Sequence, residues 1–349
     1  MESGQLTIRK WGLVKETDLG PAFYRGFRPG QVLYGSRRPY LRKVAYADFA
    51  GVCADKTFVV ESAQPAKLLP KFLPFVMTVE PFHAHSIAWS RGSINPYVNW
   101  SDVIKYEFRL PPLEDQERIA DLMWAFEETV QAKASALEAA QKAELSALVE
   151  LYGESTWPMR RVDEAGEVQL GLTISSKVRR GDNMRPYLRV ANVGDDELFL
   201  DDVREMDFNE NAFVKYRLRD GDVLLNEGQS LEYVGRSSIY RGEIDGCCFQ
   251  NSLLRFRSGD DILPEFAHGW FRRCLHMGHF ARVAKRTTSL AHLSAGLLSS
   301  QPIPVPPMVE QQRVVERLAA ARELRQTMEQ SLKETRRLMS RTLNTVLCG

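Results

Sequence analysis

The chain has 349 residues, a formal net charge of +1, 44% hydrophobic residues and 26% charged residues, which is an ordinary composition for a water-soluble protein with room for two cores. Its longest apolar run, at 72–79, is interrupted by Pro74 and is too short to span a bilayer, and residues 1–4 do not begin a signal peptide, so we expect a cytoplasmic protein without a membrane segment. A charge this close to neutral argues against a protein that grips nucleic acid by bulk charge alone.

Residues 1–112 alternate short β-like runs with Gly and Pro, and we expect a compact mixed domain there. The runs are Gln31–Tyr34, Thr57–Val60 and Val103–Arg109. Positive charge is concentrated locally, since residues 1–60 carry ten Lys or Arg and five Asp or Glu.

Residues 113–152 contain no internal Pro or Gly and predict one long helix. Apolar side chains recur at alternating steps of four and three, which is typical of a coiled-coil seam. They are Ile119, Met123, Phe126, Val130, Ala134 and Leu137.

Residues 153–307 repeat the mixed pattern and predict a second domain of the same class. Its β-like runs are Val223–Leu225, Arg236–Tyr240 and Ser252–Phe256. Residues 308–349 then predict a second long helix. Its apolar stripe comprises Val314, Leu318, Ala321, Met328, Leu332, Met339 and Val346.

Three landmarks indicate that the chain is an internal duplication. The phrase at 110–119 (LPPLEDQERI) returns at 305–314 (VPPMVEQQRV), an offset of 306 − 111 = 195 residues. Gly51-Val52-Cys53 matches Gly246-Cys247-Cys248 at the same offset, and the phrase at 28–33 matches 219–224 at an offset of 191. In both copies the Pro-Pro pair fixes the helix entry, because proline fits a first helical turn but not an interior. A duplicated chain predicts pseudo-two-fold symmetry, which suits duplex DNA.

The two predicted helices differ in charge. Residues 113–150 hold nine acids and three bases, whereas residues 309–347 hold five acids and eight bases. Opposite charge favours pairing of the two helices with each other, although each exposed contact is worth only about 0.2 to 1 kcal/mol. We therefore expect an antiparallel two-helix coiled coil within one molecule.

Candidate DNA contacts in the first domain follow its first buried strand. A loop there concentrates cations, a hydroxyl and an aromatic ring: Ser36, Arg37, Arg38, Tyr40, Arg42 and Lys43. Arginine can read guanine through two hydrogen bonds in the major groove and lysine neutralises phosphate, so we predict a recognition loop. The alternative is an ordinary solvated basic loop. Arg91 and Ser93, with Asn95 nearby, are further candidates for phosphate contacts.

Candidate contacts in the second domain lie in two segments. Asn226, Glu227, Gln229 and Ser230 follow the matching strand, and their side chains suit adenine and cytosine edges, although such residues are also common in polar turns. The second segment supplies cations and hydroxyls, which suit phosphate, with helix or turn capping as the alternative. It comprises Lys285, Arg286, Thr287, Thr288, Ser289 and His292.

Metal and catalytic sites are less favoured. His83-x-His85 and Cys274-x-His276-x-x-His279 lack a complete tetrahedral ligand set, and the five cysteines form no Cys-x-x-Cys pair. Asn95-Pro96-Tyr97 resembles a methyltransferase motif but lacks one of its prolines, and neither a Gly-rich cofactor loop nor a Walker motif is present. We expect no catalysis, no cofactor and no metal on this chain.

Taken together, these phrases resemble the specificity subunits of type I restriction-modification enzymes over nearly the whole chain. The residues that carry the resemblance are the two Pro-Pro phrases, 32–44 (VLYGSRRPYLRKV) and 221–228 (GDVLLNEG). The resemblance implies two α+β target-recognition domains joined by two conserved helices. It also implies double-stranded DNA as ligand, two DNA adenine methyltransferase subunits docked on the helices, and translocating nuclease subunits. S-adenosylmethionine, ATP and magnesium would then be bound by those partners.

One departure concerns the first domain. About 40 residues equivalent to Trp157–Asp196 have no counterpart at the N-terminus, so this domain is naturally shortened, differently built or cut by a misplaced start. Two other functions stay open. One is a coiled-coil adaptor or DNA-binding regulator without restriction partners, and the other is an autonomous methyltransferase, which would have to bind S-adenosylmethionine.

Overall fold

A computed structural model describes residues 6–8, 19–153, 156–174, 181–287 and 290–348. The chain divides into two compact units, one formed by residues 1–137 with 328–349 and the other by residues 138–327. Each unit has its own hydrophobic core, and each is described separately below. In the described part of the chain, no helix is long and apolar enough to cross a membrane.

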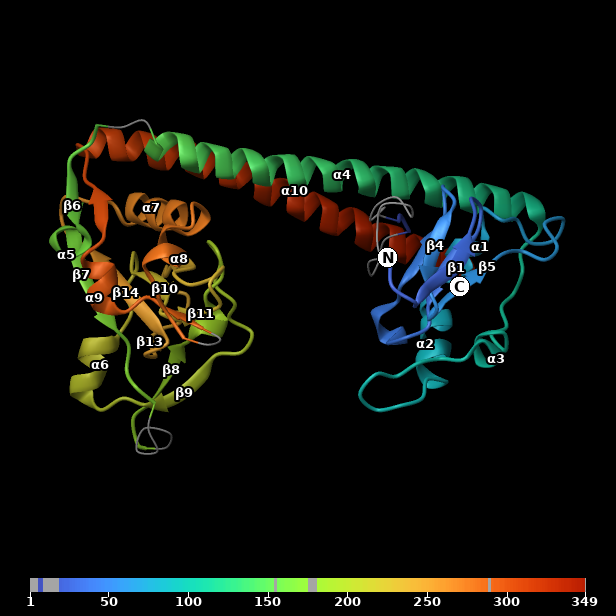
Figure 1. The fold of residues 1–349 in the computed structure, drawn as a ribbon, viewed down its shortest axis with the longest axis horizontal. Coiled ribbons are helices and arrows are strands. Elements are labelled where there is room, and N and C mark those ends of the chain that lie inside the picture. The colour runs from blue at the N-terminus through green and yellow to red at the C-terminus, as the bar shows by residue number, and fades with distance from the viewer. Residues whose placement is uncertain (1–5, 9–18, 154–155, 175–180, 288–289, 349) are drawn as a thin grey trace. The chain divides into compact units, whose positions relative to one another are not determined.

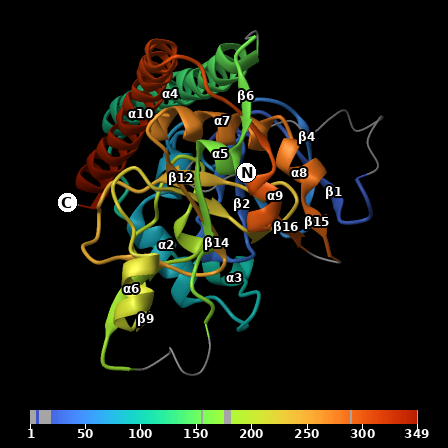
Figure 2. The same ribbon diagram turned by 90° about the vertical axis from the view of Figure 1, so that its left-hand side faces the viewer.

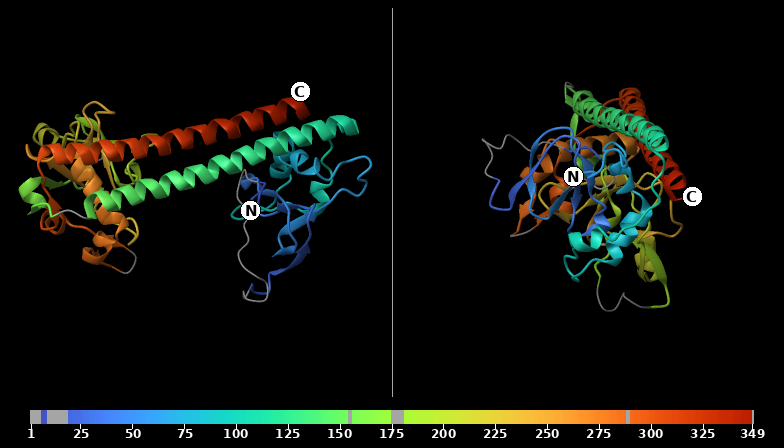
Figure 3. Two further views of the ribbon diagram at one scale, coloured as in Figure 1. Left: turned by 90° about the horizontal axis from the view of Figure 1, so that it is seen from above. Right: turned by 90° about the vertical axis from the view of Figure 1, so that its right-hand side faces the viewer.

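Two long helices contribute to both units. Helix α4 spans Leu113–Gly153 and helix α10 spans Met308–Cys348, so both begin at the residue that the Pro-Pro phrases predict. The helices lie side by side (Figure 3). In the first unit Met123 shares a core with Leu343, and in the second unit Tyr152 shares a core with Leu318. Rising numbers along α4 thus meet falling numbers along α10, which confirms the antiparallel pairing.

The predicted seam holds with one error. Ile119, Met123 and Val130 on α4 are buried, as are Val314 and Leu318 on α10. The prediction for Val346 is wrong, because its side chain is 46% exposed. Leu343 faces the core instead. The two helices also contact through polar groups: the Lys133 ammonium donates to the Ser331 hydroxyl at 2.8 Å and to the Thr335 hydroxyl at 2.7 Å.

The first unit is built on a three-stranded antiparallel sheet in the order β3-β2-β5, with a separate two-stranded antiparallel sheet of β1 and β4 (Figure 1). Its strands are β1 (Phe23–Phe27), β2 (Val32–Gly35), β3 (Val44–Tyr46), β4 (Gly51–Ala54) and β5 (Thr57–Val60). Its short helices are η1 (Pro39–Leu41), α1 (Leu73–Val76), α2 (Glu80–Ala88) and α3 (Trp100–Val103). The apolar side chains of β2, α1 and α2 pack onto α4 in one core.

The second unit contains a four-stranded sheet in the order β12-β10-β14-β7 and three smaller sheets, β11-β16-β15, β13-β8-β9 and β17-β6. Its strands are β6 (Met159–Arg161), β7 (Gly166–Leu170), β8 (Met184–Leu188), β9 (Arg204–Asp207), β10 (Val223–Asn226), β11 (Gly228–Gln229), β12 (Ser237–Ile239), β13 (Cys248–Phe249), β14 (Leu253–Ser258), β15 (Lys285–Arg286), β16 (Ala291–His292) and β17 (Pro302–Pro304). Its helices are α5 (Val162–Ala165), η3 (Val190–Asn192), α6 (Glu210–Tyr216), α7 (Pro264–His276), α8 (His279–Val283) and α9 (Ala295–Ser299). Figure 2 shows the β15-β16 hairpin and α6 at opposite sides of this unit.

The two units repeat one plan around β2 and β10. Strand β2 lies between β3 and β5, and β10 lies between β12 and β14, all antiparallel. A turn with glycine at positive φ leads into each central strand, at Gly30 (φ 89°) and Gly221 (φ 88°), a conformation that glycine adopts at little cost. The duplication deduced from the sequence is therefore a duplication of structure.

A buried glutamine makes equivalent hydrogen bonds in the two units. The Gln116 side chain is fully buried; its Oε1 accepts from the Leu69 backbone N–H at 2.9 Å, and its Nε2 donates to the carbonyls of Lys67 and Pro111 at 2.8 Å. In the second unit Gln311 makes the same three bonds at 2.8 Å, with Leu263, Asp261 and Pro306. The glutamine of each Pro-Pro phrase thus ties the helix start to a loop of its own unit.

The units differ at one edge. In the second unit β6, α5 and β7 form a segment that pairs with β17 and with β14. In the described part of the first unit no strand takes these places, and the predicted strand Val103–Arg109 is wrong: α3 ends at Val103 and residues 106–110 form no element. A run of alternating apolar residues forms a strand only where another strand supplies its hydrogen bonds.

The second unit also holds a buried ionic cluster that links its loops to both long helices. It comprises Glu144, Asp195, Asp196, Arg272, His276, Arg322 and Arg325. Arg272 on α7 donates to Glu144 on α4 and to Asp195, each at 2.8 Å. Sequence reasoning missed this cluster because its members are far apart along the chain.

Candidate nucleic-acid interface

In the first unit the predicted recognition loop follows β2 and packs beside residues 91–97. Arg37 forms an antiparallel bridge with Tyr97, and Tyr97 forms another with Arg91. The Arg38 backbone N–H donates to the Pro96 carbonyl at 2.6 Å, and its guanidinium donates to the Asn95 side-chain oxygen. The structure therefore joins two segments, 36–43 and 91–97, that the sequence had proposed separately.

The cations of this loop are not equally available. Arg42 makes two hydrogen bonds to the Glu80 carboxylate at 2.6 and 2.8 Å, and Arg91 pairs with the buried Asp102 carboxylate at 3.0 Å. For Arg37, which is exposed, and for Lys43 no ion pair is found among the described residues. Arg37 is thus the cation best placed to meet a base edge or a phosphate.

Apolar and aromatic side chains accompany these cations. Tyr40 is 51% exposed, Tyr97 is 44% exposed and Ile94 is 86% exposed, and Ser93 is also at the surface. Aromatic rings beside arginine can stack on bases or sugars while the cations neutralise phosphate. We call residues 37–43 and 91–97 together the first basic surface.

In the second unit β11 brings the other two predicted segments together. Gly228 pairs with His292 and Gln229 with Ala291, while Lys285 and Arg286 pair with the opposite edge of β16. Lys285 and Arg286 are exposed, and no ion pair to either is found in the part of the chain that the structure describes. His292 Nδ1 lies 3.3 Å from Glu227 Oε2. Residues 227–236, 285–287 and 290–292 form what we call the second basic surface.

The two surfaces occupy matching places. The Val98 backbone N–H donates to the Ser36 carbonyl at 3.0 Å, and the Leu293 N–H donates to the Glu227 carbonyl at 2.7 Å. The offsets are 293 − 98 = 195 and 227 − 36 = 191, the two values of the sequence repeat. One backbone scaffold therefore presents different side chains in the two units.

Two predicted contact residues are corrected. Ser36 is 4% exposed and its hydroxyl donates to the Lys56 carbonyl at 2.7 Å, while Asn226 is fully buried at the end of β10. Because both side chains are buried, neither can contact DNA in this conformation. Both belong to the packed interior of their units. The Thr287 hydroxyl bonds within its own turn, to the backbone of Leu290, as the capping alternative expected.

Thr288 and Ser289 lie outside the described residues. Sequence reasoning missed the pair Tyr233 and Arg236, in which the guanidinium lies 3.9 Å from the centre of the ring. Tyr233 is 40% exposed and follows Ser230 within the second basic surface. The sequence signal that could have indicated this pair is the aromatic residue three positions before an arginine in the loop after β11.

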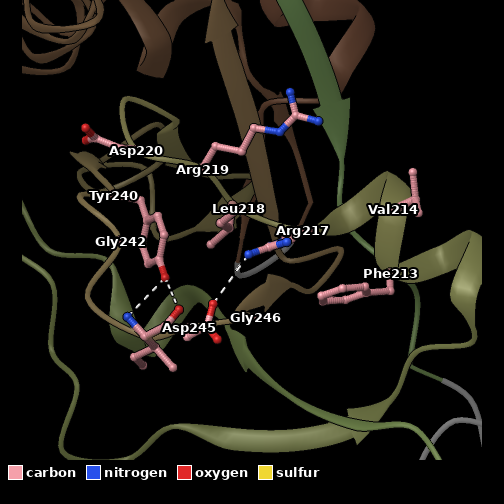
Figure 4. Close-up of a pocket in the computed structure, with 11 residues that line it drawn as sticks. Phe213, Val214, Arg217, Leu218, Arg219, Asp220, Tyr240, Gly242, Asp245 and Gly246 are labelled. Atoms are coloured by element: carbon pink, nitrogen blue, oxygen red, sulfur yellow. Dashed lines mark hydrogen bonds and ion pairs between the residues drawn. The ribbon is translucent and has the colours of Figure 1, made fainter.

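A separate cavity of about 530 Å³ lies near α6 in the second unit (Figure 4). Its polar groups already pair with each other: Arg217 lies 3.4 Å from Asp245, and the Ile244 N–H donates to the Tyr240 hydroxyl at 3.1 Å. Burial raises the pKa of Tyr240 to about 12, so that hydroxyl stays protonated at neutral pH. These side chains do not form a nucleophile and base pair.

Three of the four histidines considered as metal ligands have other partners. His85 Nε2 lies 2.8 Å from the Asp102 carbonyl, His276 Nε2 pairs with Asp195, and His279 Nε2 lies 2.8 Å from the Gln301 side-chain oxygen. Burial, helped by the nearby Arg42 charge, lowers the pKa of His83 to about 4. Among the described residues no group of three or more His, Cys, Asp or Glu side chains is arranged to hold a metal ion.

Comparison with known proteins gives consistent results. The family model for the type I restriction modification DNA specificity domain matches residues 27–144 and 154–335. The type I restriction enzyme EcoKI specificity subunit of Escherichia coli is 26% identical over 147 residues, covering 42% of this chain and 32% of that protein. The putative type I restriction enzyme MjaX specificity subunit of Methanocaldococcus jannaschii is 26% identical over 171 residues, or 47% of this chain and 39% of that protein. The matched stretches thus span between about a third and two fifths of the length of these relatives.

Solved structures show the same fold. A chain from a study of complex assembly and conformational transition of the type I R-M system superposes with a TM-score of 0.62 at 21% identity, covering 94% of this chain and 84% of that one. The type I restriction-modification system S subunit from M. genitalium gives 0.56 at 15% identity with the same coverages. Because the family model matches both units, this chain belongs to the family of type I restriction-modification DNA specificity domains.

Proposed function

We propose that this chain is the non-catalytic, sequence-recognising subunit of a type I restriction-modification complex. Each unit reads one half of a bipartite site in double-stranded DNA, the first through the first basic surface and the second through the second. Adenine methyltransferase subunits dock on the long helices, and translocating nuclease subunits complete the complex in the cytoplasm. S-adenosylmethionine, ATP and magnesium are bound by those partners.

The observation that carries this proposal is the matched position of the two basic surfaces on one repeated backbone scaffold. The Ser36 and Glu227 carbonyls accept equivalent backbone bonds, yet the residues that follow them differ. A duplicated scaffold with different exposed side chains suits a site with two unlike halves. The likeness to specificity subunits supports the choice of DNA over a protein ligand.

Within each surface we assign different roles to different side chains. Arg37 and Gln229 are the proposed base readers, since arginine suits guanine and glutamine suits adenine. Lys43, Lys285 and Arg286 are proposed to contact phosphate. Arg38, Tyr40, Arg42, Arg91, Ser93, Glu227, Ser230 and His292 complete the proposed contact set. The net charge of +1 predicts that tight binding requires the methyltransferase subunits, which share the neutralisation of phosphate.

The experiment is methylome sequencing of a methylation-free host that carries this chain and the methyltransferase encoded with it. We expect methylated adenines in one bipartite motif. Arg37→Gln should relax one half of that motif, at about 1 to 3 kcal/mol for a two-bond contact to a base. Arg28→Gln is the matched control, because Arg28 carries the same charge at the surface of the same unit and pairs with Glu61.

An adaptor or regulator would give a different result, namely no sequence-dependent methylation and no DNA binding with the methyltransferase present. Binding of S-adenosylmethionine by the isolated chain would instead favour an autonomous methyltransferase. Relaxation of both halves by Arg37→Gln would contradict the assignment of one half to each unit.

A further inference from the structure

The loop between Arg91 and Tyr97 in the first unit presents an aliphatic side chain to solvent. Ile94 lies in the middle of this loop and is 86% exposed, the largest exposed fraction of any large apolar side chain among the described residues. Single exposed apolar residues are common on protein surfaces. Ile94 differs from these because it lies within the first basic surface, on a loop that is held in a defined conformation.

The ends of this loop are joined by backbone hydrogen bonds. The Arg91 N–H donates to the Tyr97 carbonyl at 2.8 Å, and the Tyr97 N–H donates to the Arg91 carbonyl at 2.9 Å. Gly92 has a φ of 92°, a conformation that glycine adopts at little cost, so the chain can turn directly after this closure. Ile94 therefore belongs to a short loop whose two ends are fixed to each other.

Arg38 attaches the same loop to segment 36–43. Its backbone N–H donates to the Pro96 carbonyl at 2.6 Å, and its Nε and Nη2 donate to Asn95 Oδ1 at 2.9 and 2.6 Å. Asn95 directly follows Ile94, so these bonds hold the backbone beside the apolar side chain. Because isoleucine is β-branched, its side chain also has few rotamers. Binding through Ile94 therefore costs little conformational entropy.

Strand pairing places this loop beside the cations of the first basic surface. Arg37 forms an antiparallel bridge with Tyr97, and Tyr97 forms another with Arg91. Side chains that lie directly opposite each other in an antiparallel pair share one face. The face that carries Arg37 thus also carries the Tyr97 ring, which is 44% exposed, and the loop of Ile94 connects two of the segments that form this face.

The second unit repeats the arrangement with other residues. Lys285 and Gly228 both pair with His292. These pairs match the bridges that two arginines of the first unit make to Tyr97. The connection between Lys285 and His292 includes Leu290, whose side chain is 44% exposed. Both basic surfaces therefore expose an aliphatic side chain at the same place, although the residues around it differ, which indicates a kind of contact that the two surfaces share.

We propose that Ile94 recognises thymine, by contact with the C5 methyl group in the major groove of the half-site that the first unit reads. The inference rests on the proposed DNA-reading function and deepens it by naming a base. The methyl group is the apolar feature of the thymine edge, so its complement is an apolar side chain. The cations beside Ile94 favour DNA over a protein ligand, because they neutralise the phosphates that flank the base.

The test measures DNA binding by the complex of this chain with the methyltransferase encoded with it, on duplexes that carry the methylated motif. Each thymine of the motif is replaced in turn by deoxyuridine, which lacks only the C5 methyl group. We expect one replacement, in the half-site that Arg37→Gln relaxes, to weaken binding about fourfold, the equivalent of about 0.8 kcal/mol for one buried methyl group. With Ile94→Ala the same replacement should have no effect, because the methyl group has then lost its partner.

Ile104→Ala is the matched control. Ile104 is an isoleucine of the same unit, is 61% exposed and lies outside the first basic surface. This variant should keep the full effect of deoxyuridine. Because Ile94 and Ile104 are both exposed, each variant should unfold at the same temperature as the unaltered chain, which separates a lost DNA contact from a damaged fold.

Specific binding that no deoxyuridine weakens, or a deoxyuridine effect that persists in Ile94→Ala, would overturn the assignment and leave the proposed function intact. Fluorescence of 2-aminopurine that rises beside the half-site without any deoxyuridine effect would also overturn it, since Ile94 would then act as a wedge between bases. Loss of methyltransferase assembly in Ile94→Ala would overturn it in favour of a protein contact. A complex of the unaltered chain that binds all sequences alike would refute the proposed function, and this inference with it.

Discussion

Removing Arg272 should destabilise the second unit strongly at neutral pH and less so in acid. Its side chain is 8% exposed and contacts Glu144, Asp195 and Asp196 at 2.8, 2.8 and 3.6 Å. In Arg272→Met these carboxylates keep only their other partners, such as Arg325 at 2.7 Å from Glu144. Breaking a buried ion pair costs about 3 to 5 kcal/mol because it leaves buried charge uncompensated. We expect a loss near the lower end of that range at pH 7, since Arg325 and Arg322 remain.

The pH dependence follows from three groups around Arg272. Burial, assisted by the Arg272 charge, lowers the pKa of His268 to about 3, so the folded protein keeps this imidazole neutral. Below pH 6.5 the His268 imidazole is protonated in the unfolded chain but stays neutral in the folded protein. The free energy of unfolding therefore falls by up to about 1.4 kcal/mol per pH unit as the pH decreases. Without Arg272 the pKa of His268 rises, because one of the charges that lower it is removed, so this imidazole costs the variant less stability in acid than it costs the original protein. The destabilisation should therefore shrink as pH falls from 7 to 5.

The two aspartates act in the same direction. Burial opposes ionisation of Asp195, but His276 and Arg272 outweigh it and hold its pKa below the usual value, a stabilisation that is present above pH 4 and lost in acid. Burial raises the pKa of Asp196 against the pull of Arg272, so removing the arginine raises it further. At neutral pH both carboxylates are ionised, and Arg272→Met lacks the cation that pairs with them. The loss of stability in the variant is therefore largest at neutral pH.

The assay is urea unfolding at pH 7, 6 and 5, with hydrogen exchange in α7 assigning the transition to the second unit. Lys142→Met, at an exposed position on α4, is the control and should change stability by less than about 0.5 kcal/mol. Adding Glu144→Gln to Arg272→Met should restore part of the loss, because it removes the unpaired carboxylate. A loss under about 1 kcal/mol at pH 7, or one that grows toward pH 5, would refute this account of the cluster.

The remaining predictions concern packing, DNA and spacing. Gln116→Ala and Gln311→Ala should each cost about 2 to 5 kcal/mol, because three buried backbone groups lose their partners, whereas the exposed Gln312→Ala should be neutral in the same unfolding assay. Lys285→Gln with Arg286→Gln should weaken DNA binding by the assembled complex on all sequences alike and lower its salt dependence by a slope of about 1 per phosphate contact; a change of motif would contradict a phosphate role. Inserting one heptad at matched points of α4 and α10 adds about 10 Å of helix, so the gap in the methylated motif should widen by about three base pairs, and altered half-sites would refute the spacing role of the helices.

The elements most accessible from the sequence are those set by local signals. Both long helices begin where the Pro-Pro phrases place them, because proline fits only the first turn. Strands β2 and β10 follow from apolar runs after a glycine turn. Residues 103–109 fail as a strand although they alternate like one, because pairing depends on a distant segment that only the second unit supplies.

Residue type alone did not predict which candidate side chains are buried. Ser36 lies one residue from the exposed Arg37 and Asn226 one residue from the half-buried Glu227, yet the backbone ladder continues through Ser36 and Asn226 and buries their side chains. The approach of residues 91–97 to Arg37 depends on the fold of the whole unit, which no local pattern encodes. The same holds for Tyr233 and Arg236, whose contact depends on the loop after β11.

The two units share a plan but attach it to the long helices by different chemistry. At the offset of 195, Arg325 and Glu144 in the second unit match Val130 and Met339 in the first, where Val130 is 1% exposed and Met339 packs against the core. An apolar contact tolerates small shifts of register, whereas a buried carboxylate between Arg272 and Arg325 is satisfied in one register only. Buried charge thus helps to fix how the second unit meets the helices, whereas the matching positions in the first unit hold apolar side chains. Divergence after duplication therefore changed the attachment of the domains as well as the side chains proposed to read DNA.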